Sequence, residues 1–326
     1  MKFEKSIAAD RAPCFGDVNP TDAVAAFGHE MNREILALLK SLPTKTHAAA
    51  ATFLMRHFRT PFFPEFDYFC NYPTPSWSII YWLGRMGADR GVLTLEDGHH
   101  AKTAHAMALF LHPLDDHLED GQLPATHLHV LLRSQAWMRM REALDGLAAG
   151  VIGGAKIVTD FINDYYASIG CPPDLETLDG YCQHFRKQMA TGMIVPALLA
   201  AKMQPGRDFT EALTAAYGAF GIVWRLIDDL QDMEVDIAAG SHSAIYFSLP
   251  VETRQIWDSG SQREDGGRFE RIRSAVHHYG VWENIKERMA LELALAADTM
   301  EAIQMTGLAE ELRRLLRPVT DRPTTS

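Results

Sequence analysis

Apolar residues return every three or four positions along most of the chain, and alternation of β-branched with polar residues is rare. This period places apolar side chains on one face of a helix, so the pattern predicts an all-α protein. The proline-rich stretch 59–75 is expected to be an irregular connector. Helices, most of them bounded by Pro or Gly, are predicted over residues 21–42, from 76 onward, and over 98–119, 126–147, 148–166, 177–203, 209–237, 251–259, 267–279 and 281–316.

The chain shows no sign of division into separate domains. No Gly/Ser-rich or strongly charged linker interrupts it, and no internal repeat of solenoid period is found. Its 326 residues, of which 47% are hydrophobic, are enough for one large core. We therefore expect a single helical domain over residues 1–326, with flexible ends at 1–20 and 317–326.

Charge and cysteine content exclude several classes of partner. Lys and Arg total 31 against 42 for Asp and Glu, a formal charge of −11, which disfavours binding to nucleic acid. The four cysteines form no CxxC pair, as expected for a reducing, cytoplasmic location. No signal-peptide pattern is found. The longest apolar stretch, 192–201, is too short to span a bilayer and is expected to be a buried helix segment. Binding of an anionic ligand would therefore need a local source of positive charge, such as a metal ion.

Two acidic clusters with a DDxx(D/E) core follow long apolar helical runs, more than a hundred residues apart. Acidic helix ends usually form a solvated surface, and a non-catalytic binding protein remains an alternative on that ground. Like charges one helical turn apart repel unless they are hydrated or hold a cation. If the two helices face one cavity, their oxygens suit Mg²⁺ completed by phosphate oxygens. The carboxylates are Asp115, Asp116, Glu119 and Asp120 in the first cluster, and Asp228, Asp229 and Asp232 in the second.

Such a metal site favours the departure of a diphosphate from an allylic carbon, because metal ions stabilise the charge that develops. The remaining carbocation must be kept from water by apolar and aromatic walls. Ordinary core packing is the alternative role for each aromatic residue considered. The candidate cavity-lining residues are Trp77, Tyr81, Phe110, Phe220 and Trp224.

The two motifs resemble those of the class I isoprenoid synthases, in particular the branch of the trans-prenyl diphosphate synthases. The likeness covers roughly residues 98–240. It implies a helical bundle around a central apolar cavity, an allylic prenyl diphosphate as substrate, several Mg²⁺ ions bound with that diphosphate, and a homodimer. It also implies that the carboxylates of both clusters bind the metal, with Asp120 adjacent to the first set.

Departures from the family pattern restrict the reactions that we expect of this protein. Chain-elongating synthases carry a Gly-Lys-Arg-type segment and an Arg pair after the first motif, which hold a second diphosphate; neither is found here. The Asn-Asp…Ser…Glu motif of bacterial terpene cyclases is also absent. The favoured interpretation is a terpene synthase that cyclises or rearranges the carbocation. The alternative is a prenyltransferase that serves an acceptor without a diphosphate, similar to the moenomycin-type enzyme.

A few further residues are candidates for contact with the diphosphate or for proton transfer. Arg225 stands where the family usually has glutamine, Lys187 resembles the lysine of the family's Lys-Thr pair, and Ser241 lies in the loop after the second cluster. His117, inside the first cluster, is a candidate to hydrogen-bond the diphosphate or to accept a proton. The other histidines between 99 and 129 match no zinc motif.

Overall fold

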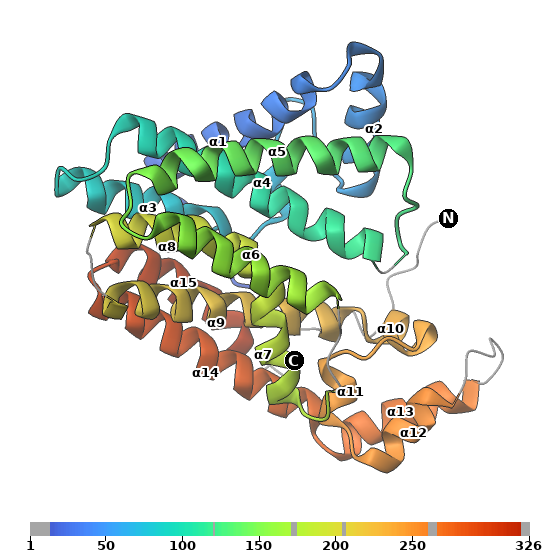
Figure 1. Cartoon of the computed structure of the whole chain (residues 1–326). Coiled ribbons are helices and arrows are strands. Elements are labelled where there is room, and N and C mark those ends of the chain that lie inside the picture. The colour runs from blue at the N-terminus through green and yellow to red at the C-terminus, as the bar shows by residue number, and fades with distance from the viewer. Residues whose placement is uncertain (1–13, 120, 171–174, 204–206, 260–265, 321–326) are drawn as a thin grey trace.

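The computed structural model describes residues 14–119, 121–170, 175–203, 207–259 and 266–320, and all regular structure within these ranges is helical (Figure 1). The all-α prediction is confirmed. The longer helices are α1 Asp22–Ser41, α2 His47–His57, α3 Pro75–Asp89, α4 Leu95–Glu119, α5 His127–Ala149, α6 Gly154–Gly170, α7 Leu178–Gln188, α8 Ala190–Met203, α9 Arg207–Gln231, α13 Gly266–His278, α14 Val281–Ala302 and α15 Thr306–Thr320. The shorter elements are η1 Thr44–Thr46, η2 Tyr68–Asn71, α10 Met233–Ala239, α11 Ala244–Ser248 and α12 Val251–Asp258.

Several predicted helices occur with nearly the predicted bounds. In α1 the Thr21 side chain accepts a hydrogen bond from the Val24 N–H at 3.4 Å, which satisfies a free donor at the helix start. The stretch 59–75 is irregular apart from η2, as predicted. Pro75 begins α3, a position where the missing N–H is not needed.

Three predicted helices are each divided in two. The stretch 177–203 breaks at Met189 between α7 and α8, and 209–237 breaks at Asp232 between α9 and α10. The stretch 281–316 breaks before α15, where Gln304 has a φ of 65° in the left-handed region. Apolar periodicity continues across each break, so the pattern alone does not reveal an interruption of one to three residues.

The most apolar helix, α8, lies inside the bundle. Nearly all of its residues are buried, and it packs against α3, α4, α6 and α9. A helix that is apolar on all sides needs neighbours on all sides. This placement confirms the expectation that 192–201 is a buried helix segment, and no helix among the described residues has the length and apolarity needed to cross a membrane.

Helices α4 and α9 lie in different parts of the bundle and end on the same side of it (Figure 1). α4 packs mainly against α5, and α9 mainly against α14. Because each acidic cluster falls at the C-terminal end of its helix, this arrangement brings the two clusters toward one region.

The chain before α1 is fixed against the bundle from Cys14 onward. Phe15 stacks on Phe220 at a centroid distance of 5.9 Å, and the Gly16 N–H donates to the Leu315 carbonyl at 3.2 Å. This segment belongs to the range expected to be flexible, while residues 1–13 and 321–326 lie outside the described part of the chain.

Candidate active site

The first acidic cluster has an inner aspartate that is already neutralised. Asp115 is 8% exposed, and Arg133 of α5 donates to its two oxygens at 2.7 and 3.1 Å. The Tyr165 hydroxyl of α6 donates to the same carboxylate at 2.7 Å. A buried charge needs a partner of this kind, so Asp115 ties α4 to α5 and α6.

The second cluster has an inner aspartate of the same kind. Asp229 is 2% exposed, with the Arg225 Nε 2.9 Å from its Oδ1. The other oxygen accepts from the Tyr181 hydroxyl and from the Ala244 N–H, both at 2.8 Å. Asp229 therefore holds α7 and α11 against α9.

The outer aspartate of each cluster faces a shared space. Asp116 and Asp228 line one cavity of about 140 Å³, which we call the motif cavity. Helices whose acidic residues lie more than a hundred positions apart in the sequence thus meet at this cavity. Its lining residues are His112, Pro113, Asp116, His117, Phe185, Met189, Gly221, Trp224, Arg225 and Asp228.

The charged form of the Asp228 carboxylate is destabilised by its surroundings. Partial withdrawal from water raises its pKa to about 6; Arg225 offsets part of this rise, and the carboxylates of Asp232, Asp229 and Asp116 add to it. Its side chain is still 57% exposed, and the nearest guanidinium nitrogen, Nη1 of Arg225, is 3.9 Å away. A cation or a hydrogen-bond donor entering the cavity would relieve this repulsion.

Arg225 supplies the positive charge of the motif cavity. Its guanidinium lies over the Phe185 ring, 5.4 Å from the centroid, and its Nε donates to the Tyr181 hydroxyl at 2.7 Å. Burial alone would lower its pKa, but the carboxylate of Asp229 raises it well above the ordinary value. Burial lowers the pKa of nearby His112, which is therefore neutral at pH 7.

His117 is held by a residue that the sequence did not indicate. Nε2 of His57, at the end of α2, lies 2.7 Å from Nδ1 of His117. Burial, and then the imidazoles of His117 and His129, lower the pKa of His57. The pair fixes the ring of His117 at the cavity wall, next to Asp116.

The donor set around the motif cavity suits a hard cation. Within the described ranges, no three Asp, Glu, His or Cys side chains already surround one point as a metal site. Asp116 and Asp228 line the cavity, whereas Glu119 and Asp232 are exposed and do not line it. Carboxylates from two helices fit Mg²⁺, which keeps several waters and is completed by phosphate oxygens. Asp120 lies outside the described residues.

Two predicted diphosphate contacts lie away from the motif cavity. Lys187 is exposed on α7, and Ser241 is exposed in the loop after α10. Neither side chain lines this cavity, whereas Arg225 does.

The predicted aromatic residues are distributed unevenly. Trp224 lines the motif cavity. Phe110 and Phe220 are fully buried in the core, Trp77 is buried in α3, and Tyr81 lines a separate groove beside the start of α4. The structure thus brings one of the five to the motif cavity.

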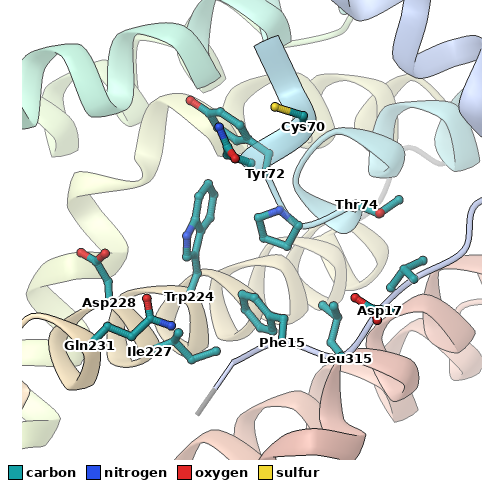
Figure 2. Close-up of a pocket in the computed structure, with 14 residues that line it drawn as sticks. Phe15, Asp17, Cys70, Tyr72, Thr74, Trp224, Ile227, Asp228, Gln231 and Leu315 are labelled. Carbon is teal, nitrogen blue, oxygen red and sulfur yellow. The ribbon is translucent and has the colours of Figure 1, made fainter. Parts of the chain in front are cut away.

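Figure 2 shows the residues that line a second cavity, of about 360 Å³. Trp224 and Asp228 line both. We call it the Asp17 cavity, after the carboxylate that the segment before α1 contributes. Its lining residues are Phe15, Gly16, Asp17, Val18, Cys70, Asn71, Tyr72, Pro73, Thr74, Trp224, Ile227, Asp228, Gln231 and Leu315.

Comparison with known proteins identifies the architecture. No protein-family model matches the sequence, and no curated protein matches it significantly. A solved geranylgeranyl pyrophosphate synthetase from Pyrococcus horikoshii superposes with a TM-score of 0.65 at 12% identity, covering 92% of this chain and 98% of that chain. A polyprenyl synthetase from Streptomyces coelicolor gives 0.65 at 11% identity, with 93% and 100% covered.

A polyprenyl synthase from Caulobacter crescentus, crystallised with calcium and isoprenyl diphosphate, gives a TM-score of 0.62 at 14% identity, with 94% of this chain and 98% of that chain covered. At such identities the likeness shows the fold alone. The chain has the all-α fold of the isoprenyl diphosphate synthases, as the motifs predicted.

Proposed function

We propose that this protein is a metal-dependent class I isoprenoid synthase that ionises an allylic prenyl diphosphate. The observation that carries the proposal is the shared motif cavity, where Asp116 from α4 and Asp228 from α9 lie with Arg225. The fold of solved prenyl diphosphate synthases supports it, and one of those structures contains a divalent cation and an isoprenyl diphosphate.

The residues of the chain divide the work at this site. Asp116 and Asp228, with the exposed Glu119 and Asp232 that follow them in the two motifs, would hold the metal. When bound, Mg²⁺ neutralises charge on the departing diphosphate. Arg225 would bind diphosphate oxygens, and the carboxylate of Asp229 keeps its guanidinium charged there. Trp224 contributes an aromatic face whose π electrons can stabilise cationic carbon.

Cyclisation or rearrangement is the first candidate for the fate of the cation. Among the described lining residues, the motif cavity has one guanidinium, Arg225, and no Lys, and the Asp17 cavity has neither Arg nor Lys. A site with one fixed cation suits one diphosphate, so elongation with a second diphosphate substrate is disfavoured.

Transfer to an acceptor is the second candidate. The specific observation in its favour is the Asp17 cavity, which adjoins the motif cavity and is large enough for a small organic molecule.

The test is incubation with geranyl, farnesyl and geranylgeranyl diphosphates and Mg²⁺, without acceptor. Hydrocarbon or alcohol products with stoichiometric pyrophosphate release are expected for cyclisation. Calorimetry with pyrophosphate then examines the non-catalytic alternative. Pyrophosphate binding that is absent, or independent of Mg²⁺, contradicts the proposed site.

We further propose a homodimer formed through α5 and α6. Val130, Met138 and Tyr166 are exposed on these helices, beside a hollow of about 890 Å³ lined in part by Trp137 and Ile162. Exposed apolar patches of this kind mark interaction surfaces. The Met138→Glu variant should run as a monomer in size-exclusion chromatography with light scattering, and a wild-type monomer would contradict the proposal.

A further inference from the structure

The Asp17 cavity is built by four segments that are distant in the sequence. Its walls come from the chain before α1, the connector around η2, the C-terminal half of α9, and α15 (Figure 2). Its volume of about 360 Å³ falls in the range of small-molecule sites. Because Asp228 and Trp224 line both cavities, a molecule bound here would lie next to one bound in the motif cavity.

The charges of this cavity select against anions. Asp17 and Asp228 contribute carboxylates, while no Lys, Arg or His is among its described lining residues. A second diphosphate would meet two negative charges and no compensating cation. A neutral hydrogen-bond donor or an ammonium group would instead be attracted. Further polar groups come from Asn71, Thr74 and Gln231.

The aromatic residues of the cavity are held in place by their own contacts. The Tyr72 and Trp224 rings meet edge to face at a centroid distance of 5.4 Å, and the Tyr72 hydroxyl donates to the Leu109 carbonyl at 3.0 Å. Phe15 is fixed by its stacking on Phe220. Fixed aromatic faces favour flat rings and cations as ligands.

We propose that the Asp17 cavity binds the acceptor for the allylic cation, an aromatic compound that carries an amine or hydroxyl group and is neutral or cationic. The inference rests on the proposed function and specifies its second candidate reaction, transfer of the prenyl group to an acceptor. The electron pair of the new bond to the allylic carbon comes from the acceptor's oxygen, from a ring carbon, or from its nitrogen when the amine is unprotonated. The C–O bond to the diphosphate breaks, its electron pair stays with the diphosphate, and the acceptor's proton passes to released diphosphate or water.

The binding test uses three probes with the same ring and different charge: tyramine, tyrosol and 4-hydroxyphenylacetate. Calorimetry or ligand-observed NMR of the full chain, without metal or diphosphate, should give affinity in that order, with tyramine at least tenfold tighter than the anion. This measurement does not depend on catalysis. Equal or tighter binding of 4-hydroxyphenylacetate, or no binding of tyramine, overturns the inference.

Two variants at Asp17 locate the bound probe. This side chain is exposed, so Asp17→Asn should weaken tyramine binding by about two- to fivefold, and Asp17→Lys should weaken it further and favour the anion. Asp164→Asn and Asp164→Lys, at an exposed position on α6 away from the cavity, are the matched controls and should change nothing. Equal responses at the two positions would show that the probe binds elsewhere.

The product test separates the two proposals. With Mg²⁺ and a prenyl diphosphate, the expected result is prenylated tyramine, detected by mass spectrometry. Pyrophosphate release without tyramine reports on ionisation alone. Release without any prenylated product, although tyramine binds, overturns the acceptor role and leaves the proposed function intact. Tyramine binding without any pyrophosphate release overturns the proposed function and with it the acceptor role, and it supports only the ligand class of the Asp17 cavity.

Discussion

At the C-terminal ends of α4 and α9, a buried aspartate is neutralised by an arginine, but the arginine comes from a different place in each case. Each end has an inner aspartate that is buried and paired with an arginine, and an outer aspartate that faces the motif cavity. At α4 the arginine comes from the next helix, where Arg133 lies 18 residues from Asp115. At α9 it comes from the same helix, because Arg225 and Asp229 lie one turn apart.

This difference distinguishes an arginine with a structural role from one that can also contact a ligand. Arg133 ties helices together, and it does not line the motif cavity. Arg225 also pairs with an inner aspartate, yet its guanidinium is part of the cavity wall. Only at α9 can the neutralising arginine also contact a ligand in the motif cavity, so variants at the two ends should fail in different ways.

The largest effect is expected at the outer aspartates. Asp116→Ala and Asp228→Ala should each lower Mg²⁺-dependent pyrophosphate release by at least about 100-fold, because each removes charge that would hold the metal. The helical circular dichroism signal should stay near wild type, since neither side chain is buried. Asp164→Asn is the control at an exposed aspartate away from the site. More than a tenth of wild-type activity in either alanine variant would contradict the assignment.

The next largest effect is expected at Arg133. Arg133→Met leaves Asp115 buried without its charged partner and should lower the free energy of unfolding by about 2–3 kcal/mol, less than for a fully buried pair because Arg133 is partly exposed. Urea unfolding measures the loss. The double variant Arg133→Met/Asp115→Asn removes the unpaired charge and should recover part of the stability. Without such recovery, the pairing does not account for the loss.

These pairings show what the sequence did and did not predict. The helical class, the irregular connector and the fold of the isoprenyl diphosphate synthases followed from periodicity and from two motifs. Pairing of Arg225 with Asp229 was accessible, because i,i+4 spacing on one helix implies proximity. Arg133, Tyr165 and Tyr181 reach the inner aspartates only through tertiary packing, and no spacing in the sequence indicates that.

The aromatic residues show the same limit of prediction from sequence. All five candidates sit at helical positions compatible with a cavity wall, yet Trp224 alone lines the motif cavity. Phe110 and Phe220 instead fill the core. Sequence composition gives the number of apolar side chains, whereas the direction each one faces depends on helix rotation and on neighbours. The Asp17 cavity could not be predicted for a related reason, because its walls come from four segments that are distant in the sequence.

A third expected effect concerns a buried carboxylate without an ion pair. Glu311 of α15 accepts hydrogen bonds from the Ser78 hydroxyl and, at 3.0 Å, from the Trp82 indole N–H. Burial raises its pKa to about 7, above the ordinary value of 4.5. The folded state therefore binds the proton more tightly than the unfolded state, and its stability falls as pH rises from about 4.5 to 7.

The Glu311→Gln variant keeps the shape without the charge, so it should lose less stability over that range. We expect the difference between wild type and variant to change by on the order of 2 kcal/mol between pH 5 and pH 8. Thermal or urea unfolding at both pH values gives the measurement. If both proteins respond alike, Glu311 is not the titrating group.

The smallest effect is expected at Lys187, which separates an exposed cation from a built-in one. Its side chain projects from α7 into solvent, where water and salt screen its charge, whereas Arg225 is fixed between Asp229 and the Phe185 ring. Lys187→Ala should thus weaken Mg²⁺-dependent pyrophosphate binding by no more than about threefold, and Arg225→Gln should weaken it by tenfold or more. Calorimetry of both variants in the same buffer makes the comparison. Equal losses would mean that α7 moves toward the motif cavity when the diphosphate binds, and Lys187 would then join Arg225 in holding it.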